Sequence, residues 1–161
     1  MCIIGFWKVT SAYGEFSNWY MKDFVYKGIT FNCSEQALMW EKAVLFNDKD
    51  IADKILASKD PKQIKALGRE VRNFDDSIWS QKRYDIMVDI LAEKFKDEKL
   101  KHMLLNTADV IIVEASPLDK IWGVGLALEN PRIYDEEKWN GTNLLGKALM
   151  QVREQIRKEE K

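Results

Sequence analysis

The chain has 161 residues, of which 46% are hydrophobic and 32% are charged, and this length fits one compact domain with a substantial core. Its 25 basic and 26 acidic residues give a formal net charge of −1, so no overall field attracts nucleic acid or a membrane surface. The first residues lack the basic region and the long apolar run of a signal peptide. Cys2 and Cys33 form neither a disulfide framework nor a metal-binding spacing, so we expect a reduced, cytoplasmic protein with no membrane partner.

The predicted elements alternate between short strands and amphipathic helices. Strands are predicted at residues 3–9 and 23–31, the second region as a hairpin that turns at Lys27-Gly28. Apolar periodicity predicts helices at 34–46, 50–58, 60–71, 75–95 and 99–107, followed by a buried strand at 109–116 and a last helix at about 143–158. Asp60 before Pro61 is expected to cap the helix at 60–71, and the Asp75-Asp76-Ser77 cluster is expected to cap the helix at 75–95. Few strands and many helices predict an α+β fold: a single helix-rich domain, residues 1–161, packed around a small β-sheet.

The predicted helix at 34–46 is apolar nearly all round and is therefore expected to be buried, yet Glu35 and Lys42 lie on one stripe of it. They are about 10 Å apart along the helix axis, which is too far for a direct pair but allows both to reach one ligand. Two other roles remain open. Asn32 as the N-cap would place Glu35 in a capping box, and Lys42 could extend to solvent along its aliphatic stem.

The long predicted helix at 75–95 has Arg83 on its apolar side, one turn after Trp79. A guanidinium keeps its charge, so Arg83 needs a carboxylate, a carbonyl or an anionic ligand. An internal ion pair beside a core tryptophan fits this pattern, and so does a binding role for both residues. Because buried charges cost stability unless they are well paired, charges on the apolar faces of two helices favour a binding cavity.

The buried strand at 109–116 runs into a turn with Asp119 and then into a segment with Trp122, Gly123 and Gly125. Loops after strand ends are frequent locations for functional sites. The two glycines would let backbone N–H groups approach an anion, although the third glycine of a dinucleotide fingerprint is missing. Asp119 fits a turn or cap as well as it fits a catalytic residue.

The last predicted helix begins at Thr142 or Asn143, with Lys147 one turn further on. The N–H groups at such a start suit a phosphate, and an ordinary turn and cap fits equally well.

His102 is the only histidine, so zinc sites and catalytic triads have at most one histidine candidate. Carboxylates, a lysine, an arginine and tryptophans are left for chemistry, and this chemistry requires neither a metal nor a cofactor.

Seven stretches of the sequence, taken in order, resemble the NADAR family and in particular its YbiA-like N-glycosidase branch. They are YGEFSNWY (13–20), GITFNCSEQALMWEKAVLF (28–46), LGREV (67–71), Trp79 with Arg83, KF (94–95), VEASPLDKIWGVGL (113–126) and WNGTNLLGKALMQVR (139–153). Together they extend over essentially the whole chain. Family members usually have a proline after the first stretch, where this chain has Met21 and Lys22, and this departure concerns the rim of the pocket and therefore the substrate.

The resemblance implies an N-glycosidase that hydrolyses the N-glycosidic bond of ribosylamino-pyrimidine phosphate intermediates of riboflavin biosynthesis and releases ribose 5-phosphate. Other family members remove ADP-ribose from modified guanine in nucleic acid, so this activity is the alternative. A non-catalytic module that binds ADP-ribose or a nucleotide is a further alternative. The expected partner is a small phosphorylated ribosyl compound, and nucleic acid is expected only as an ADP-ribosylated substrate.

The functional residues of the family correspond here to Glu35, Trp79 and Asp119. We expect the two carboxylates to divide the acid and base roles, and Trp79 to stack on the heterocycle. Lys42 either holds phosphate together with Arg83 or attacks C1 of the opened sugar to form a Schiff base. The other expected substrate-binding residues are Asn18, Trp122, Gly123 and Asn143.

Overall fold

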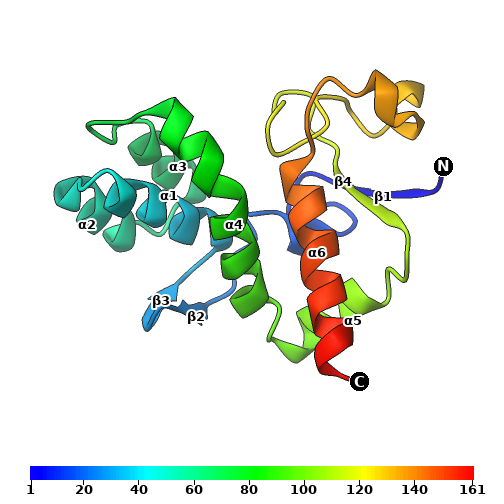
Figure 1. Cartoon of the computed structure of the whole chain (residues 1–161), viewed down its shortest axis with the longest axis horizontal. Coiled ribbons are helices and arrows are strands. Elements are labelled where there is room, and N and C mark those ends of the chain that lie inside the picture. Colours follow the sequence, from blue (N-terminus) through cyan, green and yellow to red (C-terminus); the bar gives the residue numbers. More distant parts are fainter. The chain divides into compact units, whose positions relative to one another are not determined.

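The computed structural model describes residues 1–161 and contains two compact units (Figure 1). The first unit comprises Met1–Ser17 and Phe95–Lys161, and the second comprises Asn18–Lys94. Six α-helices and four short strands confirm the α+β class, and the strands form two separate two-stranded sheets. The single domain expected over residues 1–161 stays a prediction. Even the longest helix, α4, is too polar to span a bilayer, and no other helix combines enough length with enough apolar character.

The first unit is built on a pair of parallel strands that lie far apart in the sequence. Strand β1 (Ile3–Phe6) pairs with β4 (Ile111–Glu114), with Ile3 opposite Ile111. Helix α6 (Leu144–Glu159) packs against β4, and α5 (Glu98–Leu105) packs against α6. The core of this region is formed by Val113, Ala115, Val124, Leu126 and Ile133. Short 3-10 turns at Gly14–Phe16, Pro131–Tyr134 and Glu136–Lys138 complete the unit.

The second unit is centred on helix α1 (Ser34–Leu45). It packs against α2 (Lys49–Ala57), α3 (Pro61–Gly68) and α4 (Asp76–Lys94), and Figure 1 shows these helices together in cyan and green. Before α1, the chain forms the hairpin of β2 (Phe24–Tyr26) and β3 (Ile29–Phe31).

The hairpin turn was predictable because its chemistry is local. Lys27 and Gly28 both have positive φ, 52° and 77°, which is the conformation that a tight two-residue hairpin requires. Glycine adopts it at no steric cost. The predicted hairpin and its turn are therefore confirmed.

The helix caps agree with the sequence at two helices and differ at a third. Asp60 accepts a hydrogen bond from the Lys62 amide at the start of α3, and Asp75 caps α4 as expected. The Asn32 cap considered as an alternative for α1 is absent, because Cys33 is the N-cap residue, and the Cys33 side chain makes no capping bond.

The side chain that reaches back at the start of α1 belongs to Gln36. Its Oε1 accepts a hydrogen bond from the Asn32 amide at 2.7 Å. The capping-box role considered for Glu35 is therefore taken by a different residue.

Candidate functional site

The residues predicted to form the site are divided between the two units. The second unit carries Asn18, Glu35, Lys42, Trp79 and Arg83, and the first carries Asp119, Trp122, Gly123 and Asn143. That these residues all meet at one substrate stays a prediction.

Glu35 lies in the first turn of α1, with only 8% of its surface exposed. Its amide donates to the Asn18 carbonyl oxygen at 2.9 Å, and the Ser34 hydroxyl donates to Asn18 Oδ1 at 2.8 Å. Asn18 Nδ2 donates in turn to Met87 Sδ on α4 at 3.5 Å. Asn18, predicted to bind substrate, thus uses its side chain inside the protein, where it fixes the helix turn that carries Glu35.

Lys42 is half-buried two turns further along α1, and its Nζ lies 4.6 Å from the centroid of the Phe74 ring. Burial lowers the pKa of the Lys42 ammonium, the carboxylate of Glu35 opposes this shift, and the charge of Arg69 adds to it. The ammonium therefore does not simply extend into water. An amine with a lowered pKa is neutral more often than an ordinary lysine, as a nucleophile must be.

Trp79 and Arg83 lie one turn apart in the first half of α4. Trp79 is only 6% exposed. The Nε of Arg83 is buried and has no hydrogen-bond partner, and the guanidinium forms no ion pair. The internal ion pair considered for Arg83 is thus absent. A buried donor without a partner costs about 1–3 kcal/mol, and a ligand that accepts a hydrogen bond from this Nε would remove that cost.

In the first unit, Asp119 orders the turn that follows β4. Its Oδ1 accepts hydrogen bonds from the amides of Ile121 and Trp122, both at 2.9 Å. Its own amide donates to the Ser116 hydroxyl oxygen at 3.1 Å. Asp119 is therefore a turn-capping residue through one oxygen, while Oδ2 has no partner in the protein and the residue is only partly buried. The capping role orients the carboxylate and leaves one oxygen for chemistry.

Gly123, expected to let an amide approach an anion, is required here by packing. An added Cβ would lie 2.8 Å from Glu114 Oε2 and 2.9 Å from the Asp119 carbonyl oxygen. Its carbonyl oxygen accepts a hydrogen bond from the Asn143 amide at 3.0 Å. The close approach of the loop to the end of β4 therefore explains the glycine without a ligand, whereas the neighbouring Trp122 indole is partly exposed.

Asn143 ties the start of α6 to strand β4. Its Oδ1 accepts from the Glu114 amide and its Nδ2 donates to the Ile112 carbonyl oxygen, both at 3.0 Å. The amides of residues 142–145 all donate to carbonyl oxygens of residues 120–123. These amides are therefore unavailable to a phosphate, and of the two alternatives the ordinary turn accounts for them.

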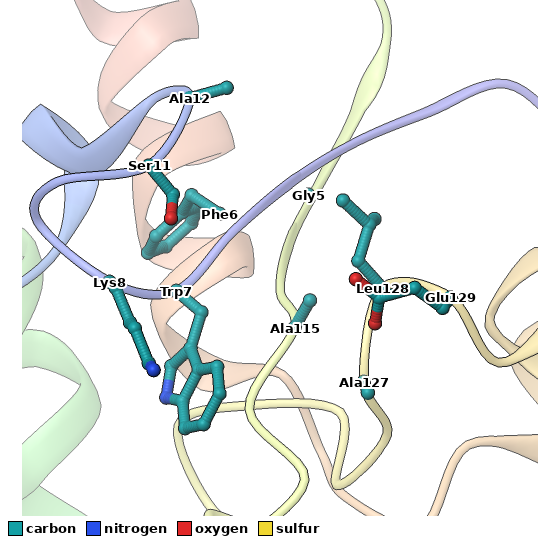
Figure 2. Close-up of a pocket in the computed structure, with 10 residues that line it drawn as sticks. All are labelled: Gly5, Phe6, Trp7, Lys8, Ser11, Ala12, Ala115, Ala127, Leu128 and Glu129. Carbon is teal, nitrogen blue, oxygen red and sulfur yellow. The ribbon is translucent and has the colours of Figure 1, made fainter.

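Two structural features escaped the sequence analysis. The buried carboxylate of Asp48 caps α2 through the Ile51 amide and binds the Arg72 guanidinium at 2.8 Å. An aspartate directly before a helix was the available signal for the cap, but nothing local indicated its partner 24 residues away. The second feature is a cavity of about 270 Å³ in the first unit, which is lined by none of the predicted site residues (Figure 2).

This chain is similar in sequence to a known domain family and to several named proteins. The model of the NADAR domain matches residues 5–157. An N-glycosidase of Acanthamoeba polyphaga mimivirus is 45% identical over 123 residues, which are 76% of this chain and 72% of the relative. The protein irg-1 of Caenorhabditis elegans is 44% identical over 133 residues, 81% of this chain and 63% of that protein.

A relative from Vibrio vulnificus, named a riboflavin biosynthesis protein, is 30% identical over 154 residues, which are 95% of this chain and 38% of that protein. This chain thus spans less than two thirds of both the nematode and the Vibrio relative. The NMR structure of Escherichia coli YbiA superimposes with a TM-score of 0.81 at 28% identity and covers 99% of this chain and 87% of YbiA. Since the domain model covers nearly the whole sequence, this protein belongs to the NADAR family.

Proposed function

We propose that this protein hydrolyses the N-glycosidic bond of ribosylamino-pyrimidine phosphates and releases ribose 5-phosphate. The match of the NADAR domain to residues 5–157, with relatives named N-glycosidases, is the observation that carries the proposal. These relatives confirm the class predicted from the sequence, a hydrolase acting on N-glycosyl compounds. The relative named for riboflavin biosynthesis supports the pyrimidine substrate.

The proposed chemistry uses two carboxylates. Breaking an aminoribosyl bond develops positive charge at C1 of the sugar, which a carboxylate stabilises while a base orients water and an acid protonates the leaving amine. Glu35 and Asp119 divide these roles in the proposal. Their settings support it, because Asn18 fixes the helix turn of Glu35 and the turn amides fix Asp119 through a single oxygen.

Lys42 offers a second route for the same substrate. Its neutral amine would attack C1 of the opened sugar, the leaving amine would take the heterocycle away, and water would then release the sugar from the Schiff base. The lowered pKa of Lys42 supports this route. Arg83, whose Nε lacks a partner, is the proposed phosphate-binding group in both routes.

The proposal is tested by incubating the protein with the ribosylamino-pyrimidine phosphate and measuring ribose 5-phosphate by chromatography. ADP-ribosylated guanine in DNA is offered in the same tube as a competitor. Faster release from the pyrimidine is expected, and faster release from the modified DNA would replace the proposed substrate. Binding of ADP-ribose without release from either substrate would contradict an enzyme and favour a binding module.

The two chemical routes are separated by trapping with borohydride during turnover. A sugar adduct on Lys42 in the mass spectrum, lost in Lys42→Arg, assigns the Schiff base. Turnover without any adduct leaves the two carboxylates as the catalytic groups.

A further inference from the structure

The cavity of about 270 Å³ in the first unit lies beside the ends of the two parallel strands (Figure 2). Trp7 follows β1, Ala115 follows β4, and the Ala115 amide donates to the Phe6 carbonyl oxygen at 2.7 Å. Leu128 covers another side and packs on Gly5, where an added Cβ would lie 2.4 Å from Leu128 Cδ1. The region beyond the carboxyl ends of parallel strands is where α/β sheets commonly bind ligands.

Trp7 supplies a flat aromatic surface to this cavity. Its residue surface is 38% exposed, and Lys8 Nζ lies 5.2 Å from the ring centroid. In Figure 2 the Lys8 ammonium lies beside the indole, and Ala115 and Ala127 lie beyond the opposite edge of the ring. An indole with this exposure has surface left to contact a flat ligand. Exposed aromatic rings of this kind stack on nitrogen heterocycles.

Three exposed polar side chains at the cavity have no hydrogen-bond or ion-pair partner in the protein and are free to contact a ligand: the Lys8 ammonium, the Ser11 hydroxyl and the Glu129 carboxylate. The carboxylate accepts hydrogen bonds from amino groups, and the ammonium and hydroxyl donate to carbonyl oxygens. One positive and one negative charge give this lining no net charge. A neutral ring that bears both amino and carbonyl groups therefore matches the cavity better than a phosphate does.

The cavity also limits the size of the ligand. Its volume lies just below the roughly 300–1,000 Å³ of most small-molecule pockets, which suits one or two fused rings. We infer that this cavity binds the heterocycle that leaves in the reaction, an amino-substituted pyrimidinone ring, either alone or fused within guanine. The inference rests on the proposed N-glycosidase function. It transfers the stacking role from Trp79, which is almost fully buried, to Trp7.

The chain links this cavity to Asp119. Ala115 forms part of the cavity wall, and the next residue, Ser116, accepts the Asp119 amide hydrogen bond on its hydroxyl oxygen. The loop that carries Asp119, one of the two proposed catalytic carboxylates, thus begins at the cavity wall. A heterocycle held there would contact Ala115, four residues before Asp119.

The inference is tested by calorimetric titration of the full chain with two probes, a triaminopyrimidinone and a methylguanine. Trp7→Leu removes the stacking surface and Ala127→Leu fills the cavity, while Tyr134→Leu changes an exposed aromatic residue of the same unit outside the lining. We expect both cavity variants to weaken heterocycle binding, by about 5- to 150-fold for Trp7→Leu, and Tyr134→Leu to bind like the wild type. Tighter binding of the triaminopyrimidinone indicates a free pyrimidinone ring as the ligand, and tighter binding of the methylguanine indicates guanine.

Unchanged heterocycle affinity in both cavity variants, or no binding of either probe to the wild type, would overturn the inference. Melting curves verify that each variant is folded. Failure of this inference can be distinguished from failure of the proposed function. Heterocycle binding that depends on Trp7, without any release of ribose 5-phosphate, supports the heterocycle site and contradicts the N-glycosidase activity. Release of ribose 5-phosphate with unchanged KM in Trp7→Leu and Ala127→Leu contradicts the cavity alone.

Discussion

Asp119 combines, at the scale of one residue, the two roles that its sequence context left open. One carboxylate oxygen caps the turn through the Ile121 and Trp122 amides, and the other has no partner in the protein. The two hydrogen bonds of the cap therefore also fix the orientation of the Asp119 carboxylate. The cap alone does not require a negative charge, because an amide oxygen accepts the same two hydrogen bonds.

Asp119→Asn should separate these roles. The asparagine oxygen preserves the turn, so we expect a melting temperature close to that of the wild type. Loss of the ionisable group should slow release of ribose 5-phosphate by at least ~100-fold. Asp119→Ala, which removes the cap as well, should be equally slow and also less stable. Wild-type rates in Asp119→Asn would remove this residue from the chemistry.

Lys42 gives the Schiff-base route a pH dependence. Burial lowers its pKa, so the neutral amine is populated at lower pH than the ordinary lysine value of about 10.4 allows. The yield of borohydride-trapped adduct in a single turnover should rise with pH and level off below that ordinary value. A yield that keeps rising up to the ordinary lysine pKa would contradict a desolvated nucleophile.

At the scale of elements, the start of α6 shows why polar residues near a helix end need not bind a ligand. The Asn143 side chain satisfies one amide and one carbonyl group of β4, from 29 and 31 residues away in the sequence. The sequence pattern of a turn, an asparagine and a helix predicted the element correctly. It could not tell whether the polar groups face a phosphate or a strand, because the partner strand is distant in the chain.

Asn143→Ala should therefore act mainly on stability. It leaves the Glu114 amide and the Ile112 carbonyl oxygen without their partner, which should lower the free energy of unfolding by about 2–4 kcal/mol in urea denaturation. Asn106→Ala, at an exposed asparagine after α5 with no side-chain hydrogen bond, serves as the control and should change it by less than about 0.5 kcal/mol. Equal effects in the two variants would contradict the structural role of Asn143.

The link between Asp48 and Arg72 makes the helices of the second unit sensitive to acid. The guanidinium and the Arg72 amide hold the pKa of the Asp48 carboxyl well below its usual range. The unfolded chain, with an ordinary aspartate pKa of about 3.9, therefore binds more protons than the folded chain at low pH. The stability from this pair is complete above that value and is lost as the pH falls below it.

Asp48→Asn should accordingly flatten the acid side of the stability curve. Between pH of about 5 and 3, the wild type should lose more unfolding free energy than the variant, as measured by urea denaturation at each pH. Asp53→Asn makes the same change at an exposed aspartate of the same helix and should keep the wild-type slope. Identical slopes in all three proteins would show that Asp48 does not carry this dependence.

At the scale of the whole molecule, local patterns predicted the elements, and long-range contacts decided the roles of the site residues. The hairpin turn at Lys27-Gly28 and the Asp60 cap follow from neighbouring residues, and both are confirmed. The choice between Glu35 and Gln36 as the capping side chain depended on a shift of the N-cap by one residue, which the pattern could not resolve.

The cavity at Trp7 was beyond local analysis for a related reason. Its wall joins residues that follow β1 with residues that follow β4, and only the parallel pairing of these strands brings them together. Nothing in the stretch from Trp7 to Ser11 marks it as a binding surface by itself. The family resemblance, in contrast, rests on ordered motifs along the whole chain, and the match of the NADAR domain confirms it.

The central claim is that a carboxylate buried in the first turn of α1 acts on an N-glycosidic bond, and release of ribose 5-phosphate tests it most directly. Glu35→Gln should slow this release by at least ~100-fold, whereas Glu41→Gln, the same change at an equally buried glutamate of α1 that pairs with Lys27, should keep nearly the wild-type rate. Equal rates in the wild type and Glu35→Gln, with both proteins folded, would contradict the account.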